Sequence, residues 1–162
     1  DFENDNNGWM IAASPGTSVD HLPFGWNDSS GSMGLSADII NGNASEVTVL
    51  QCANDPPGVL DASIEVLQQS APDAGLFSVN LWAFSTQDCD FSGFLSMNPL
   101  APAPSTPLSS WTQFLLSGFV MPAGSASVML EILVSTGSNT NARYAIDYVN
   151  VSADVIFRSN FE

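Results

Sequence analysis

Apolar and polar residues alternate along much of this chain, with the period of two that is typical of strands with one buried face. At residues 76–85, Phe77, Val79, Leu81 and Ala83 form a wholly apolar face. At residues 126–134, every second residue starting from Ala126 is apolar. Both segments therefore predict strands that contribute one face to a hydrophobic core.

Turn-forming sequences separate the predicted strands. Asn41-Gly42-Asn43 lies between two apolar-rich runs, 33–40 and 46–52, and predicts a hairpin. The proline-dense stretch 99–107 predicts an extended connection between two sheets. Residues 12–32 are rich in turn chemistry and are expected to form a loop.

Further strands are expected in the middle and at the end of the chain. At residues 62–69 a short helix is the alternative, but the β-branched Ile64 and Val66 favour a strand. The remaining predicted strands are 111–120 and 144–152, and the closing residues show another apolar alternation. Eight or more short strands without a convincing helix predict an all-β sandwich of two antiparallel sheets.

Composition limits the classes of partner. The chain has 162 residues, which suits a single domain over 1–162. Its 17 acidic residues face only two basic ones, Arg143 and Arg158, so the formal net charge is -15. This charge opposes binding to nucleic acids and anionic membranes. The sequence contains no run of eighteen apolar residues, so membrane insertion is not expected. The charge is compatible with divalent cations and with neutral ligands such as sugars.

The cysteines and the start of the chain indicate an extracellular protein. The chain begins at Asp1, which we interpret as a mature secreted protein, with a trimmed fragment as the alternative. In that setting Cys52 and Cys89 are expected to form a disulfide, and two buried free thiols are the alternative. A cysteine-ligated metal is not expected, because His21 is the only histidine.

The second face of the strand at 76–85 carries the candidate ligand-binding residues. It presents Asn80, Trp82 and Phe84, and aromatic rings beside an amide are typical of a sugar-binding surface. Trp26, in the loop at 12–32, is a further candidate for stacking on a sugar ring. The alternatives are that Trp82 covers a small apolar cluster under a loop, and that Trp26 covers an edge of the core.

Catalysis is not expected. A hydrolytic triad needs a base beside a nucleophile, and the single histidine stands in a loop rich in proline and glycine. Paired carboxylates hydrolyse glycosides, but 17 acidic residues make some pairs inevitable. We therefore predict a protein that is not an enzyme.

Several stretches, taken together and in order, resemble the jelly-roll carbohydrate-binding modules. They are Phe2-Glu3 followed by Trp9, FSVNLWAFS at 77–85, WTQF at 111–114 with VMPAGSASVMLEI at 120–132, and YAIDYVNV at 144–151. The resemblance implies a jelly-roll β-sandwich whose partner is a glycan. The stretches 53–61 and 98–110 look like insertions relative to the family.

The resemblance also implies a structural calcium ion that joins the first strand to the last. Glu3 and Asp147 would supply its oxygen ligands. Asp147 stands in an otherwise apolar strand, where an unpaired carboxylate is costly. A salt bridge to Arg143 or Arg158, or an exposed strand edge, is the alternative explanation.

Two functions follow from these observations. The first is a non-catalytic, extracellular module of the carbohydrate-binding type that binds neutral glycan chains such as polysaccharides. The alternative is a structural or adhesive subunit that assembles with other copies of itself into a filament, surface array or matrix. In that case the terminal segments DFEN and VIFRSNFE would be donors for strand addition.

Overall fold

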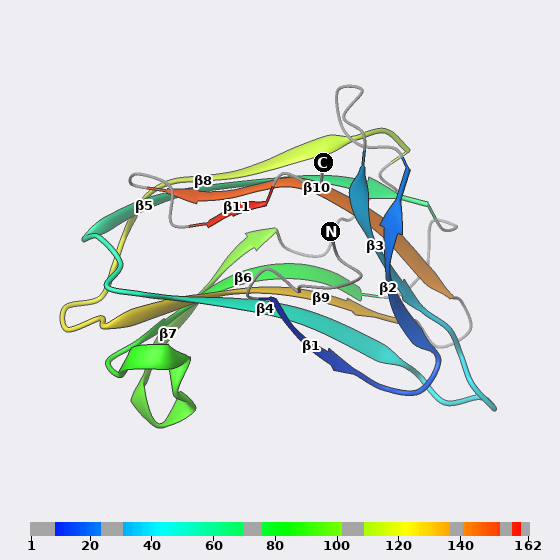
Figure 1. The fold of residues 1–162 in the computed structure, drawn as a ribbon, viewed down its shortest axis with the longest axis horizontal. Coiled ribbons are helices and arrows are strands. Elements are labelled where there is room, and N and C mark those ends of the chain that lie inside the picture. The colour runs from blue at the N-terminus through cyan, green and yellow to red at the C-terminus, as the bar shows by residue number, and fades with distance from the viewer. Residues whose placement is uncertain are drawn as a thin grey trace.

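The protein is a sandwich of two antiparallel sheets (Figure 1). The computed structural model describes residues 9–23, 31–69, 76–101, 109–136, 141–152 and 157–159. In these ranges the chain forms eleven strands and two short 3-10 turns. No helix among the described residues has the length and apolar character needed to cross a membrane. The predicted all-β sandwich is confirmed.

One sheet has five strands in the order β1-β4-β9-β6-β7. Their bounds are Trp9–Ala13 for β1, Glu46–Asn54 for β4, Ser127–Ser135 for β9, Leu76–Phe84 for β6 and Phe94–Ala101 for β7. The 3-10 turns η2 (Gln87–Cys89) and η3 (Phe91–Gly93) connect β6 to β7 and project away from the other sheet (Figure 1).

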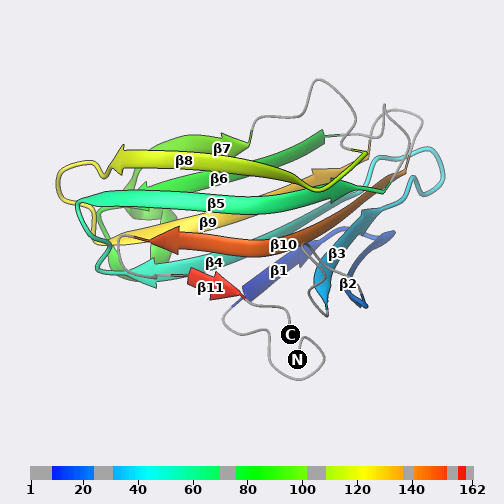
Figure 2. The same cartoon turned by 90° about the horizontal axis from the view of Figure 1, so that it is seen from above.

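The second sheet has six strands, with β2-β3-β10-β5-β8 in order and β11 paired to β10. Their bounds are Thr17–Leu22 for β2, Ser32–Ala37 for β3, Ala142–Ser152 for β10, Val59–Gln68 for β5, Thr112–Val120 for β8 and Phe157–Ser159 for β11. Seen from above, β5, β8 and β10 cover the strands of the five-stranded sheet (Figure 2).

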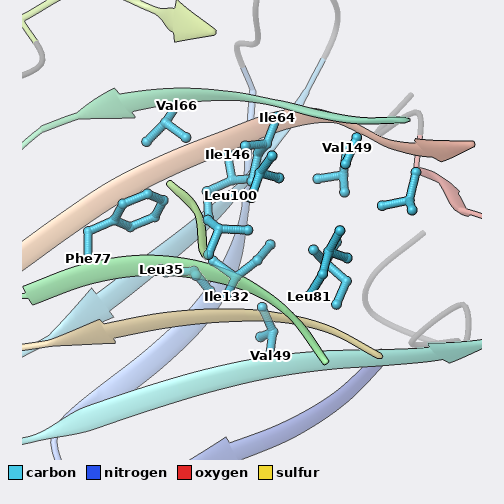
Figure 3. Close-up of a cluster of buried hydrophobic side chains, with 14 of the residues drawn as sticks. Leu35, Val49, Ile64, Val66, Phe77, Leu81, Leu100, Ile132, Ile146 and Val149 are labelled. Atoms are coloured by element: carbon cyan, nitrogen blue, oxygen red, sulfur yellow. The ribbon is translucent and has the colours of Figure 1, made fainter. Parts of the chain in front are cut away.

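The core fills the space between the sheets. Phe77, Leu81 and Ile132 of the five-stranded sheet point toward Ile64 and Ile146 of the six-stranded sheet (Figure 3). The apolar faces predicted at 76–85 and 126–134 are confirmed, because all their members except the half-buried Ala126 are buried in this core. Burial of these side chains supplies the main driving force for the sandwich.

The predicted hairpin at Asn41-Gly42 is wrong, although its turn is present. Asn41 and Gly42 both have positive φ, of 52° and 78°, and a single bridge joins Ile40 to Asn43. The flanking strands do not pair with each other, because β3 belongs to the six-stranded sheet and β4 to the five-stranded one. The turn residues set the local backbone, and the core decides the sheet to which each strand belongs.

Two strands lie where the sequence pattern predicted loops. The stretch 12–32 contains β2, whose residues are half-buried or exposed. Because this strand buries no face completely, its sequence shows no strong apolar period. The expected connection at 99–107 begins inside the edge strand β7, where Pro99 pairs with Asn80. Proline is tolerated there because an edge strand has one unpaired side. Residues 102–108 lie outside the described part of the chain.

Candidate functional site

The outer face of the five-stranded sheet carries the predicted binding residues. Strand pairing aligns Leu50 with Glu131, Glu131 with Asn80, and Asn80 with Pro99. The next row in the same direction places Met129 beside Trp82 and Trp82 beside Met97. Because side chains two residues apart share a face, these two rows form one continuous surface.

Glu131 is the charged group at the centre of this surface. Its Oε2 accepts hydrogen bonds from Asn80 Nδ2 at 2.8 Å and from Trp82 Nε1 at 3.0 Å. Hydrogen bonds to a carboxylate are stronger than those between neutral groups, so they fix the Trp82 ring and the Asn80 amide in place. Glu131 itself is half-buried, and neither contact uses its Oε1.

Four aromatic rings, one of them the Trp82 ring that Glu131 holds, pack edge to face. The centroid of the Trp82 ring lies 5.8 Å from that of Phe91 and 5.6 Å from that of Phe94. The centroids of Phe84 and Phe91 are 5.4 Å apart. Phe91 is 60% exposed and Phe94 is 48% exposed, whereas Phe84 is completely buried. We call the surface formed by Trp82, Phe91, Phe94, Met97 and Glu131 the aromatic face.

A disulfide holds the turns that carry Phe91. Cys52 and Cys89 are joined with an S–S distance of 2.04 Å, which confirms the predicted pair. The Cys89 amide also donates to Ser127 Oγ at 3.0 Å, and the Asp90 carboxylate accepts from the Ser92 amide at 2.9 Å. Cys89, Phe84 and Met129 form a small apolar cluster beneath the turns. These contacts hold Phe91 against the sheet without a long element of secondary structure.

The predicted ligand-binding residues have different positions. Trp82 belongs to the aromatic face and is half-buried, and the buried Asn80 lies next to it on the same outer face of the sheet. Phe84 has no exposed surface, so it supports the rings above it and does not offer a stacking surface of its own. Trp82 packs against the small apolar cluster under the turns, as the alternative interpretation of this residue expected. Trp26 lies outside the described residues.

Sequence reasoning missed Glu131, Phe91 and Phe94. Alternation assigns Glu131 to the outer face of its strand, but its position beside Trp82 depends on the pairing of β6 with β9, 49 residues apart. Phe91 and Phe94 flank the turn after Cys89 and have no period that marks them. The disulfide was the available signal, because it ties this aromatic turn to the sheet.

Asp147, the expected calcium ligand, lies on the outer face of the other sheet. It is 4% exposed and stands opposite Glu65 on β5, so the alternative of an exposed strand edge is wrong. Its Oδ1 accepts from the Tyr148 amide at 2.7 Å, and Tyr148 has a positive φ of 46° where β10 changes register. Arg143 forms an ion pair with Asp38. Glu3 and the side chain of Arg158 lie outside the described residues.

The surroundings of Glu65 accord with oxygen-ligand chemistry. Burial raises the pKa of the Glu65 carboxyl, a hydrogen bond from Gln113 lowers it, and the charge of Asp147 raises it further. Glu65 Oε1 is buried and has no hydrogen-bond partner. Facing carboxylates are ligands that calcium accepts. Among the described residues, however, no group of three or more His, Cys, Asp or Glu side chains is close enough to hold a metal.

Comparison with known proteins gives the fold class. The chain has the jelly-roll β-sandwich fold of carbohydrate-binding modules. It superposes on the C-terminal family 22 module of the Clostridium thermocellum xylanase Xyn10B with a TM-score of 0.59 and 14% identity, covering 96% of this chain and 93% of that one. No family model matches the chain, and no curated protein matches its sequence.

Two further structures were solved with oligosaccharides. The module TmCBM61, in complex with β-1,4-galactotriose, has a TM-score of 0.56 and 11% identity, covering 98% of this chain and 94% of that one. The family 11 module of Clostridium thermocellum, in complex with a mixed-linked tetrasaccharide, has a TM-score of 0.55 and 11% identity, covering 99% and 95%. At these identities the likeness shows a common fold.

Proposed function

We propose that the aromatic face binds a neutral glycan chain. One observation carries this proposal: two exposed phenylalanine rings pack against a half-buried tryptophan, and a carboxylate on the same face of the sheet holds the tryptophan ring in place. Aromatic rings contact the apolar C–H face of a pyranose, and a carboxylate accepts hydrogen bonds from its hydroxyls. The oligosaccharide ligands of the structural neighbours support the same class of partner.

The charge of the surface favours neutral over acidic glycans. The rows that form the aromatic face contain no arginine or lysine, and the chain as a whole carries a net charge of -15. A uronic acid or sulfate group would therefore meet Glu131 without a cationic partner. The row that contains Asn80 and Glu131 extends across Leu50 on β4 to Met10 on β1, which gives the surface room for a chain segment.

Affinity electrophoresis in gels that contain xylan, β-1,4-galactan or mixed-linkage β-glucan tests the proposal. We expect at least one polysaccharide to retard the protein, and Trp82→Ala or Phe91→Ala to weaken binding about tenfold. Leu115→Ala is the matched control, because Leu115 is an equally exposed apolar residue on β8 of the other sheet. Absence of retardation in every gel, or equal weakening by the control, would reject glycan binding at this face.

Self-assembly is the second candidate. Phe91, Phe94 and Met97 form an exposed apolar cluster on or beside the edge strand β7, and a second copy would bury it. Sedimentation velocity over a wide concentration range separates the two functions. Association that Phe91→Ser abolishes supports assembly, and a monomer at every concentration opposes it. The disulfide supports a secreted, extracellular setting for either function.

We also propose that calcium binds at Asp147. The support is the facing Glu65 carboxylate with its unpartnered buried oxygen, since calcium prefers oxygen ligands. A thermal melt with excess calcium and then with a chelator tests the idea. We expect the chelator to lower the midpoint for the unmodified protein and to leave Asp147→Asn unchanged. Equal midpoints with and without chelator in the unmodified protein would contradict it.

A further inference from the structure

A small polar pocket lies on the outer face of the six-stranded sheet, on the side of the molecule opposite the aromatic face. Its volume is about 270 Å³. Strands β2, β3 and β10 form it together with residues that directly follow β3 and β5. The polar side chains that line it are Ser18, Asp20, Ser36, Asp38, Gln69 and Arg143.

Strand pairing places three of these six groups in one row. Ser18 stands opposite Ser36, and Ser36 stands opposite Arg143. The Ser18 hydroxyl donates to Asp20 Oδ2 at 2.6 Å. It also lies 2.6 Å from the Ser36 hydroxyl, and because its own proton is used by Asp20, the Ser36 hydroxyl donates to Ser18. On the other side Arg143 forms its ion pair with Asp38. The polar groups are thus ordered by contacts within the protein before a ligand arrives.

A glycine lets the Leu22 side chain lie close to the sheet at one side of the pocket. Gly34 stands opposite Asp20, and a Cβ atom placed there would come within 3.0 Å of the Leu22 side chain. The Leu22 side chain lies over this glycine and gives the pocket one apolar wall. The result is a hollow with an aliphatic surface on one side and hydrogen-bonding groups around it.

We propose that this pocket binds a single neutral sugar ring. Hydroxyl groups both donate and accept, and the pocket offers carboxylate acceptors from Asp20 and Asp38 together with donors from Arg143 and Gln69. Leu22 contacts the C–H face of the ring. The volume is slightly below the range of pockets for drug-sized ligands, which suits one ring and not a chain. Two carboxylates against one guanidinium disfavour an anionic ligand.

This site is independent of the glycan chain proposed for the aromatic face. A protein with one site on each outer face is bivalent, and it links a glycan chain on one side to a sugar on the other.

Titration of the ¹⁵N-labelled protein with methyl β-xyloside, methyl β-glucoside and methyl β-galactoside tests the proposal by NMR. We expect at least one glycoside to produce saturable shifts at the amides of Ser18, Gly34 and Gln69. The double variant Asp20→Ala, Ser36→Ala should weaken this binding about tenfold. Trp82→Ala should leave it unchanged, as should Glu46→Gln, which neutralises an exposed acid on the other sheet.

The outcomes separate this site from the aromatic face. No saturable shift with any of the three glycosides, or shifts confined to residues around Trp82, overturns the pocket and leaves the glycan-chain proposal standing. Equal weakening by Glu46→Gln also overturns it. If the double variant loses its dispersed spectrum, Asp20→Asn preserves the shape and is expected to weaken binding about threefold.

Discussion

The two outer faces of the sandwich are built from the same alternating pattern but are stabilised by different means. On the five-stranded sheet, a disulfide-linked turn carries the Phe91 ring, and one carboxylate holds the Trp82 ring against which Phe91 packs. On the six-stranded sheet, short polar side chains leave a hollow that hydrogen bonds and an ion pair define. Alternation produces an outer face, but the size of its side chains decides whether that face is a platform or a pocket.

Removal of the disulfide should damage only the aromatic face and should have the largest effect on stability. Cys52→Ala with Cys89→Ala opens a loop with a sequence separation of 37 residues, and the chain-entropy model assigns such a loop about 4 kcal/mol. Urea unfolding measures the change in the free energy of unfolding. The amide shifts that glycosides produce at the polar pocket of the six-stranded sheet should persist in native conditions. Their loss would show that the two faces are coupled.

Replacement of Glu131 should have an intermediate effect. Glu131→Ala leaves the buried Asn80 amide and the Trp82 indole N–H without their acceptor, which we expect to cost about 1–3 kcal/mol. Glu131→Gln retains one acceptor and should cost less. Urea unfolding of both variants checks this order. If the glutamine variant is the less stable of the two, the carboxylate does not organise the rings.

Neutralisation of Glu65 should have the smallest effect, and its sign depends on pH. The pKa of Glu65 is raised in the folded state, so the folded protein favours the protonated carboxyl. The folded protein therefore loses stability as the pH rises from the pKa of the unfolded state through that of the folded state. In the presence of a chelator, which removes the calcium proposed for this pair of carboxylates, Glu65→Gln removes this loss and should be the more stable protein at neutral pH, with the advantage disappearing in acid. Urea unfolding between acidic and neutral pH measures it, with the exposed Glu46→Gln as control. An advantage that is independent of pH would contradict this explanation.

The strands and the core could be predicted because they depend on local alternation. Val79 and Leu81 enter the core through the period of their own strand. The aromatic face could be predicted only in part, since Glu131 reaches Trp82 through a pairing between distant segments. Trp82 and Phe84 share a face in the sequence pattern, yet the turns cover Phe84 completely and Trp82 only partly. Coverage of this kind is set by tertiary structure, which a period-two pattern does not contain.

Pro99 has a consequence for how copies of this chain meet. It lies in β7, the edge strand of the five-stranded sheet among the described residues, and a proline has no backbone N–H to offer to a neighbouring strand. Continuation of this sheet from one molecule into the next is therefore disfavoured at the edge where the exposed rings lie. A neighbouring molecule would contact the Phe91 and Phe94 side chains and would not extend the backbone ladder. Such contacts are easier to reverse than strand addition, so the protein can expose aromatic rings with a lower risk of fibre formation.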